Sequence, residues 1–292
     1  MESKQRLNTY RNLNNWHNFR LRLFGEGIIV GLFAGVIVGF FRYALNFVEV
    51  QRGAIYRYMA SSDWIITVLW FGILLLTAAI LHFLVAYEPL SAGSGIPQVK
   101  GAILGFFKMR WFHVLWTKLA GGILGIGAGL SLGREGPSIQ LGAMAAQGLS
   151  RLLGRSRMEE RYLLTSGASA GLAAAFNAPL AGVIFSLEEL HHNFSAVVLL
   201  PAMAAALTAT AVSQLIFGSA TIFNFLDLPA LPLQYFGLII ILGLILGVFG
   251  ALFNYSLINV SKFYQLPFFK NTFSRAGFAL ILAGILGFYL PE

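Results

Sequence analysis

The chain has 292 residues, of which 57% are hydrophobic and only 11% charged, and its mean hydropathy is +0.73. Soluble domains carry about 25% charged residues, so this composition excludes a water-soluble globular protein. The formal net charge of +8 would suit nucleic acid, but the basic residues gather in an N-terminal tail and in one short connector. That placement marks the cytoplasmic face of a membrane protein and argues against a nucleic-acid partner.

The chain begins with a polar tail over residues 1–25, which we expect on the cytoplasmic side of the plasma membrane. The tail has five basic residues, namely Lys4, Arg6, Arg11, Arg20 and Arg22. The basic connector contains Arg151, Arg155, Arg157 and Arg161. We expect it on the same side as the tail.

Apolar stretches long enough for membrane helices follow the tail. They cover 27–48, 64–87, 114–132, 137–153, 162–176, 178–190, 196–217, 234–261 and 276–290. A helix crosses the hydrocarbon core with about 20 residues, so these stretches predict an all-α polytopic membrane protein. Several of them are short or interrupted by Gly and Pro. Such broken helices are tolerated at membrane depth only where they line a cavity inside the protein.

Glycines recur every fourth residue in two series. One series is Gly27, Gly31, Gly35 and Gly39, and the other is Gly121, Gly125, Gly129 and Gly133. Small residues at this spacing let helices approach closely, so both series predict tight helix packing.

An internal repeat relates the two ends of the chain. Residues 31–48 match 243–260 at eight of eighteen positions, and Gly72-Ile73-Leu74 matches Gly284-Ile285-Leu286 at the same offset of 212. Transporters are often built from such repeats, with the binding site between them. The repeat predicts a first membrane unit over 26–220 and an incomplete second unit over 221–292. We therefore expect the chain to be a fragment of a longer protein.

The segment Gly93-Ser94-Gly95-Ile96-Pro97 has the composition of a loop that opens a helix. Glycine permits unusual backbone angles, and proline suits the first turn of a helix. The N–H groups at the start of such a helix form an anion site, to which Ser94 adds a hydroxyl donor. An ordinary turn between helices is the alternative.

Gly133-Arg134-Glu135-Gly136-Pro137 repeats this architecture with an acidic residue in place of the serine. A glutamate at membrane depth is costly and marks a functional site by default. Glu135 could stand in for a bound anion and swing away to accept a proton. A helix-capping carboxylate paired with Arg134 is the alternative.

Glu188 and Glu189 end an apolar run that follows Asn177-Ala178-Pro179. On a helix the two acids point about 100° apart, so we expect only one to face the protein interior. We expect this to be Glu189, buried without a cationic partner and able to relay protons. A solvated helix end is the alternative.

Two patterns resemble catalytic or metal motifs but lack their context. Gly167-Ala168-Ser169-Ala170-Gly171 fits the G-x-S-x-G pattern of serine hydrolases, yet it lies in a small-residue helix, where packing is the simpler role. Glu188 and His191 have the spacing of a carboxylate–histidine ligand pair, but the pattern occurs once. The sequence has no cysteine, so it contains no thiolate metal site. We expect no enzyme, no metal and no cofactor.

The motifs GSGIP at 93–97 and GREGP at 133–137, with the stretch 166–189, resemble the CLC family of chloride channels and proton/chloride antiporters. The resemblance covers the chain beyond its N-terminal tail and about the first two-thirds of the family's membrane domain. It implies an inverted-repeat helical fold with a truncated second repeat. It also implies a homodimer with one anion pathway per subunit.

The resemblance assigns roles to individual residues. Ser94 matches the family's chloride-coordinating serine, within a chloride-binding segment that includes Gly95, Ile96 and Pro97. Glu135 matches the gating glutamate that accepts protons from outside, and Glu189 matches the internal proton-transfer glutamate of the exchangers. The residues that shape the loop around Glu135 are Gly133, Arg134, Gly136 and Pro137.

These matches lead to the hypothesis of a Cl−/H+ antiporter in the lipid bilayer, with chloride and protons as the transported ions. A passive chloride channel and a non-transporting fragment are alternatives. An intramembrane serine protease using Ser169 is a remote one. A fluoride exporter is disfavoured because GSGIP keeps the chloride-type serine. The family's third filter motif, G-x-F-x-P, and its later coordinating tyrosine are absent from this sequence.

Overall fold

A computed structural model describes residues 2–60, 64–192, 194–219 and 232–290, with side chains described from His17 onward except at Ala60. These residues form ten α-helices. They are α1 (Glu2–Ala60), α2 (Trp64–Tyr87), α3 (Ile96–Leu104), α4 (Trp111–Gly127), α5 (Glu135–Leu152), α6 (Arg157–Phe176), α7 (Pro179–Phe185), α8 (Ala196–Phe217), α9 (Phe236–Phe263) and α10 (Thr272–Tyr289). No strand occurs among the described residues, so the all-α prediction is confirmed.

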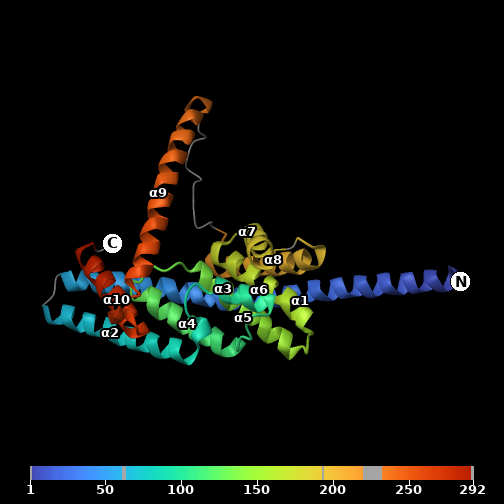
Figure 1. The fold of residues 1–292 in the computed structure, drawn as a ribbon, viewed down its shortest axis with the longest axis horizontal. Coiled ribbons are helices and arrows are strands. Elements are labelled where there is room, and N and C mark those ends of the chain that lie inside the picture. The colour runs from blue at the N-terminus through green and yellow to red at the C-terminus, as the bar shows by residue number, and fades with distance from the viewer. Residues whose placement is uncertain (1, 61–63, 193, 220–231, 291–292) are drawn as a thin grey trace.

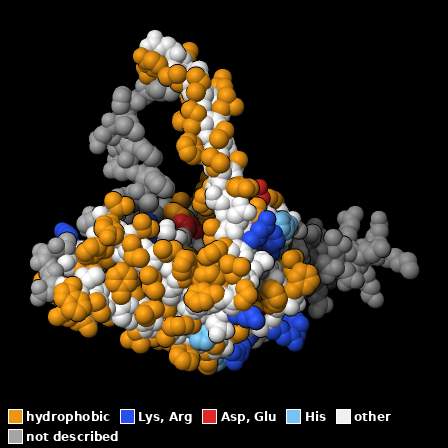
Figure 2. Space-filling view, turned by 60° about the vertical axis from the view of Figure 1, so that its left-hand side comes forward, with side chains coloured by type: hydrophobic (Ala, Val, Ile, Leu, Met, Phe, Trp, Pro, Cys, Tyr) orange, Lys and Arg blue, Asp and Glu red, His pale blue; other side chains and the backbone are white. Residues whose placement is uncertain are grey.

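Five helices are long and apolar enough to cross a membrane, within the described part of the chain. They are His17–Met59 in α1, Trp64–Tyr87, Ala196–Phe217, Leu233–Phe263 around α9, and Thr272–Tyr289. The apolar runs 64–87 and 196–217 coincide with α2 and α8. Hydrophobic side chains cover most of the face in Figure 2, as a surface in contact with lipid requires. The side chains of Lys4, Arg6 and Arg11 and the predicted repeat boundary at 220–221 lie outside the described residues.

The core consists of α1, α5, α6 and α8, and glycine backbones form its closest contact. A Cβ added to Gly142 of α5 would lie 2.1 Å from the carbonyl oxygen of Gly167 on α6. One added to Gly171 would lie 2.1 Å from the carbonyl oxygen of Ser138. No side chain fits at these positions. The G-x-S-x-G pattern therefore contributes its glycines to a helix–helix contact.

The two periodic glycine series have different outcomes. In α1, a Cβ on Gly27 or Gly31 would come within 2.6 Å of a carbonyl oxygen of α8, so the predicted tight packing is confirmed there. The second series does not form such a face. Gly121 and Gly125 leave ordinary spacing to their neighbours, and Gly129 and Gly133 follow the end of α4 at Gly127. The prediction of tight packing is wrong for the second series, because α4 ends at Gly127, halfway along it.

The two parts of the sequence match that define the predicted repeat behave differently in the structure. The matching triplets meet directly, because Gly284 of α10 packs against Leu74 of α2, and an added Cβ would lie 2.7 Å from the Leu74 Cδ1 atom. The longer matching segments have unlike surroundings. Residues 31–48 bury one face in the core, whereas no residue of α9 is buried in the described structure, and Figure 1 shows α9 rising away from the other helices.

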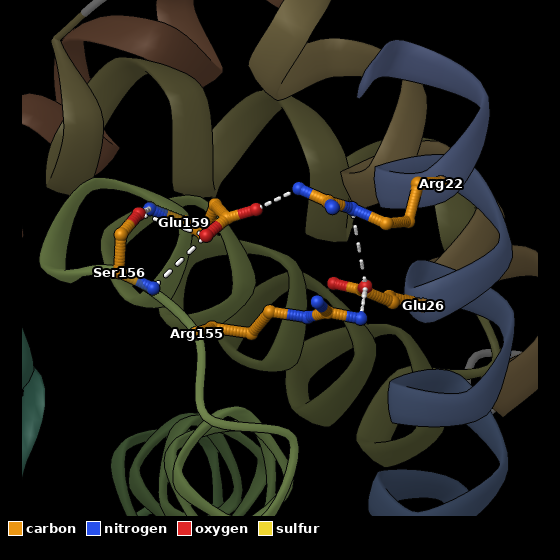
Figure 3. Close-up of polar contacts among 5 residues, drawn as sticks. All are labelled: Arg22, Glu26, Arg155, Ser156 and Glu159. Atoms are coloured by element: carbon orange, nitrogen blue, oxygen red, sulfur yellow. Dashed lines mark hydrogen bonds and ion pairs between the residues drawn. The ribbon is translucent and has the colours of Figure 1, made fainter. Parts of the chain in front are cut away.

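Ion pairs join α1 to the connector between α5 and α6 (Figure 3). Arg22 and Glu26 of α1 pair with Glu159 and Arg155 respectively, and Ser156 caps α6 by exchanging hydrogen bonds with Glu159. The Ser156 hydroxyl and backbone N–H donate to one Glu159 oxygen at 2.8 and 2.9 Å. The start of the first span and the basic connector therefore lie at the same end of the bundle, as their charge predicted.

Candidate functional site

The two glycine-rich loops meet, although Ser94 and Glu135 lie far apart in the sequence. Ser94 precedes α3, and Glu135 is the first residue of α5. A Cβ added to Gly136 would lie 2.3 Å from the carbonyl oxygen of Ser94 and 2.5 Å from its hydroxyl. Position 136 must therefore be glycine for the loops to touch. The helix starts predicted from the Gly/Pro clusters are both present.

The loop before α3 depends on left-handed backbone at two positions. Gly93 has φ 69° and Gly95 has φ 98°, angles that L side chains rarely adopt. Gln140 packs directly behind Gly95, and its amide nitrogen donates to the Leu90 carbonyl at 2.8 Å. Pro97 lies in the first turn of α3, where no backbone N–H is needed. The first N–H groups of α3 are thus presented at the loop next to Ser94.

The Glu135 carboxylate folds back over its own loop. A Cβ on Gly133 would lie 2.0 Å from its Oε2 atom, so the space it occupies exists only because residue 133 is glycine. Within the described residues Glu135 forms no ion pair, with Arg134 or any other cation. The carbonyl of Arg134 accepts from the Ser138 hydroxyl at 2.7 Å and closes the first turn. The capping alternative with Arg134 is therefore not what the structure contains.

Both loops line one cavity of about 730 Å³. Ser94, Ile96 and Gly133 contribute to its wall, together with Glu135, Gly136 and Pro137. Gly95, Pro97 and Arg134 lie in the same two loops but do not line it. Two helix N-termini open on this cavity, and each favours negative charge. The cavity therefore combines hydroxyl and backbone donors with one carboxylate, that of Glu135.

Lys118 is a cavity residue that the sequence reasoning missed. Its side chain is buried at 5% exposure in the middle of α4, and its ammonium donates to the carbonyls of Ser91 and Gly93 at 3.0 and 2.6 Å. It thereby fixes the loop that carries Ser94 and adds a positive charge to the wall. A lysine inside the apolar run 114–132 was the available signal, since such charges are costly in a membrane. Arg275 of α10 also lines the cavity.

Glu189 lies apart from the cavity, in a π-helical turn over Ser186–His191. Its side chain is half exposed and pairs with Lys100 of α3, the Nζ and Oε1 atoms being 3.0 Å apart. Glu188 is exposed as well. The expectation that Glu189 is buried without a cation, and that only one acid faces outward, is therefore wrong. The π-turn at the end of the span turns both acids toward the surface.

Ser169 lies in the middle of α6 and is completely buried. The strand–turn–helix context of a nucleophile is absent, and its hydroxyl has no hydrogen-bond partner among the described residues. The only histidine bound to α6 within that part of the chain is His191, whose Nδ1 lies 3.0 Å from the Thr165 hydroxyl. These contacts favour the packing role over the protease alternative.

Comparisons with known proteins bear on the family of this chain. The family model described as voltage gated chloride channel matches residues 72–292. The H(+)/Cl(−) exchange transporter ClcA of Vibrio cholerae is 34% identical over 282 residues, which cover 91% of this chain and 58% of the relative. ClcA of Klebsiella pneumoniae is 35% identical over 243 residues, covering 81% of this chain and 51% of the relative. The chain thus spans little more than half the length of these curated relatives.

Solved structures of CLC antiporters have a similar fold. A slow cyanobacterial Cl−/H+ antiporter superposes with a TM-score of 0.82 at 32% identity, covering 92% of this chain and 64% of that one. A CLC-type fluoride/proton antiporter superposes with a TM-score of 0.74 at 26% identity, covering 92% and 65% respectively. The family model covers well over half of the chain, and the fold agrees with it. The chain therefore belongs to the CLC family of voltage-gated chloride channels and transporters.

Proposed function

We propose that this chain provides the anion-binding part of a proton-coupled chloride antiporter, which is a transporter and not an enzyme. The observation that carries the proposal is the meeting of Ser94 and Glu135 at one cavity, onto which two helix N-termini open. Similarity to exchangers from Vibrio and Klebsiella supports protons and chloride as the transported ions.

In this proposal chloride binds between the Ser94 hydroxyl and the backbone N–H groups of Gly95, Ile96 and the following turn. Pro97 sets the start of the helix and donates no hydrogen bond. Glu135 alternates with chloride. When ionised, it occupies the anion position near the N-terminus of α5, and when protonated it leaves and carries a proton. The glycines at 133 and 136, with Arg134 and Pro137, give its side chain room to swing.

Glu189 is proposed as the proton-transfer group at the other end of the path. It lies beyond α3 from the cavity, and Lys100, one turn into that helix, connects the two places. Half exposure gives Glu189 direct contact with water, which suits a group that collects protons from bulk solvent. A passive channel would not need this carboxylate.

We further propose a cytoplasmic N-terminus in a plasma-membrane protein that assembles as a homodimer. The support for the orientation is the excess of basic residues at the end where α1 meets the connector. Cysteines at His17 and Met158, introduced into this cysteine-free chain, should react with a membrane-impermeant maleimide only after cells are opened. Reaction from outside intact cells would reverse the orientation. Cross-linking in the membrane tests the dimer.

The division into a tail (1–25), a first repeat (26–220) and the start of a second, inverted repeat (221–292) also remains a proposal. The contact of α2 with α10 supports it, because the matching triplets lie on those helices.

The function is tested by paired chloride and proton fluxes from proteoliposomes. Since the chain spans 58% of the Vibrio exchanger, both the chain itself and a chimera continuing with the remaining part of that relative are measured. Protons should move against their gradient when chloride runs down its own. Glu135→Gln should leave chloride flux and abolish proton flux, because an amide neither occupies an anion site as a carboxylate does nor carries the proton. Chloride flux that never drives protons in the unmodified chimera would favour the channel alternative.

A further inference from the structure

A second cavity, of about 280 Å³, opens at the basic end of the bundle, between the C-terminal ends of α3 and α5 and the start of α6. It shares no lining residue with the larger cavity at Ser94. Four basic side chains line it, namely Lys108, Arg151, Arg157 and Arg161. Only one acidic residue, Glu160, lines it with them.

The charge of this pocket is not balanced from within the protein. Glu160 accepts a hydrogen bond from Gln147 at 2.7 Å and lies 3.8 Å from Arg151. Lys108, Arg157 and Arg161 pair with no carboxylate in the part of the chain that the structure describes. Three uncompensated cations therefore face one small space. All four basic side chains are exposed, so water screens them from one another, but together they give the pocket a positive potential that attracts anions.

A buried amide in the wall also lacks a partner. Gln147 is only 3% exposed, and its Nε2 atom donates to Glu160. Its Oε1 atom is buried without a hydrogen-bond partner among the described residues. This oxygen is closed to solvent, so it does not contact a ligand in the pocket, and Gln147 contributes to the wall through its hydrogen bond to Glu160.

Exposed apolar side chains occur in the segments that form the pocket. Phe107 lines it, and Leu104, Phe106, Leu152 and Met158 lie nearby in the sequence with exposures of 47 to 79%. Basic pockets between membrane helices, bordered by apolar residues, are the places where acidic lipid headgroups bind. These apolar side chains would contact the acyl chains of a lipid whose headgroup enters the pocket.

We propose that this pocket binds a phosphate-bearing anion. The guanidinium groups of Arg157 and Arg161 hold its phosphate oxygens, since planar arginine donors match phosphate geometry. Two sources share this chemistry: free phosphate, and the headgroup of a phospholipid such as phosphatidylglycerol, which brings both a phosphate and hydroxyls. The proposal does not depend on the transport activity.

The test is calorimetric titration of the full chain in detergent with three ligands: short-chain phosphatidylglycerol, short-chain phosphatidylcholine and inorganic phosphate. Phosphatidylglycerol should bind at one saturable site, and phosphatidylcholine, which has no net charge, should not. Arg157→Gln with Arg161→Gln should weaken binding about 25-fold, or about fivefold per cation, the order that one basic residue contributes near acidic lipid. The matched control is Arg57→Gln, which removes an exposed arginine outside the pocket.

The variants distinguish a binding site from a general charge effect. Arg157→Lys with Arg161→Lys keeps the charge and should retain most of the affinity. Binding of inorganic phosphate with the same loss in the glutamine variant would identify free phosphate as the ligand and would support the proposal. The proposal is overturned if neither phosphate nor phosphatidylglycerol binds the unmodified chain. It is equally overturned if Arg57→Gln weakens binding as much as the pocket variant does.

Discussion

Lys100 and Glu189, 89 positions apart in the sequence, form an ion pair with 3.0 Å between the ammonium nitrogen and a carboxylate oxygen. The pair connects α3, whose first residue lines the cavity at Ser94, to the π-turn that follows α7. Both side chains remain partly exposed, at 30% and 50%. A pair of this kind contributes about 1 kcal/mol or less to stability, so its position at the end of the proposed proton path is the more informative property.

Replacing Glu189 by glutamine should abolish proton flux and leave chloride flux, because the amide cannot carry a proton and does not line the anion cavity. Glu188→Gln is the matched control, one residue away and also exposed. Paired fluxes from the chimera provide the measurement. If coupling survives Glu189→Gln and fails in Glu188→Gln, the neighbouring acid is the transfer group. Intact coupling in both variants would mean that neither carboxylate transfers protons and that both are solvated groups at a helix end.

Replacing Lys118 by methionine should destabilise the chain by about 1–3 kcal/mol, because the carbonyls of Ser91 and Gly93 lose their buried donor. Chloride affinity should fall with it, since the same bonds hold the loop of Ser94. Thermal unfolding and calorimetric chloride titration measure the two effects. Lys118→Arg, which keeps the charge, should retain part of both. An unchanged melting temperature in Lys118→Met would show that the ammonium does not hold the loop.

Adding one methyl group at Gly171 should destabilise the contact between α5 and α6. The new Cβ would lie 2.1 Å from the Ser138 carbonyl oxygen, so a helix has to shift, at a cost of about 1–3 kcal/mol or more. Gly72→Ala is the control, because nothing lies within 4 Å of a Cβ there. Thermal unfolding in detergent compares the two variants. Equal melting temperatures would mean that the contact between α5 and α6 accommodates the extra methyl group without loss of stability.

Acid should weaken the link between α1 and the connector through Glu159, which lies outside the predicted spans. Burial opposes ionisation of this carboxyl, but hydrogen bonds from Ser156 and the charges of Arg22 and Arg155 outweigh burial and lower its pKa below 4.5. A lowered pKa stabilises the fold above the ordinary value, and this contribution is lost as the pH falls through the lowered one.

Melting temperatures measured at decreasing pH test this link. Glu159→Gln should melt lower than the unmodified chain at neutral pH, and the difference should shrink in acid. Glu49→Gln, which changes an exposed carboxyl elsewhere on α1, should follow the unmodified curve. A difference that stays constant down to the lowest pH would exclude Glu159 as the titrating group.

The sequence predicts the helices well and the contacts between them poorly. The runs 64–87 and 196–217 are continuously apolar and have polar or glycine-rich ends, so their helices follow from composition alone. The Gly/Pro cluster predicts a helix start at Pro137, and α5 begins two residues earlier, at Glu135. The meeting of Gly136 with Ser94 is different, because it depends on how α3 and α5 pack and no local pattern encodes that.

Individual side-chain environments were the least predictable part of the site. Glu189 has the same local sequence whether buried or paired, and its partner Lys100 comes from a helix far away in the chain. Lys118 carried a readable signal as a charge within an apolar run, although its hydrogen-bond partners did not. The similar segments 31–48 and 243–260 also differ in exposure, because one face of the first packs against other helices and no residue of the second is buried.

The glycine contacts of Gly142, Gly167 and Gly171 have a mechanical consequence. At these glycines backbone rests directly on backbone, so no side chain there can change its rotamer to let α5 slide along α6. Motion at the start of α5 then belongs to the Glu135 side chain and its loop. Events of that size occur over nanoseconds to microseconds, whereas collective helix shifts take roughly microseconds to milliseconds. If Glu135 acts as the proposed gate, these glycine contacts hold α5 in place while the side chain of Glu135 moves.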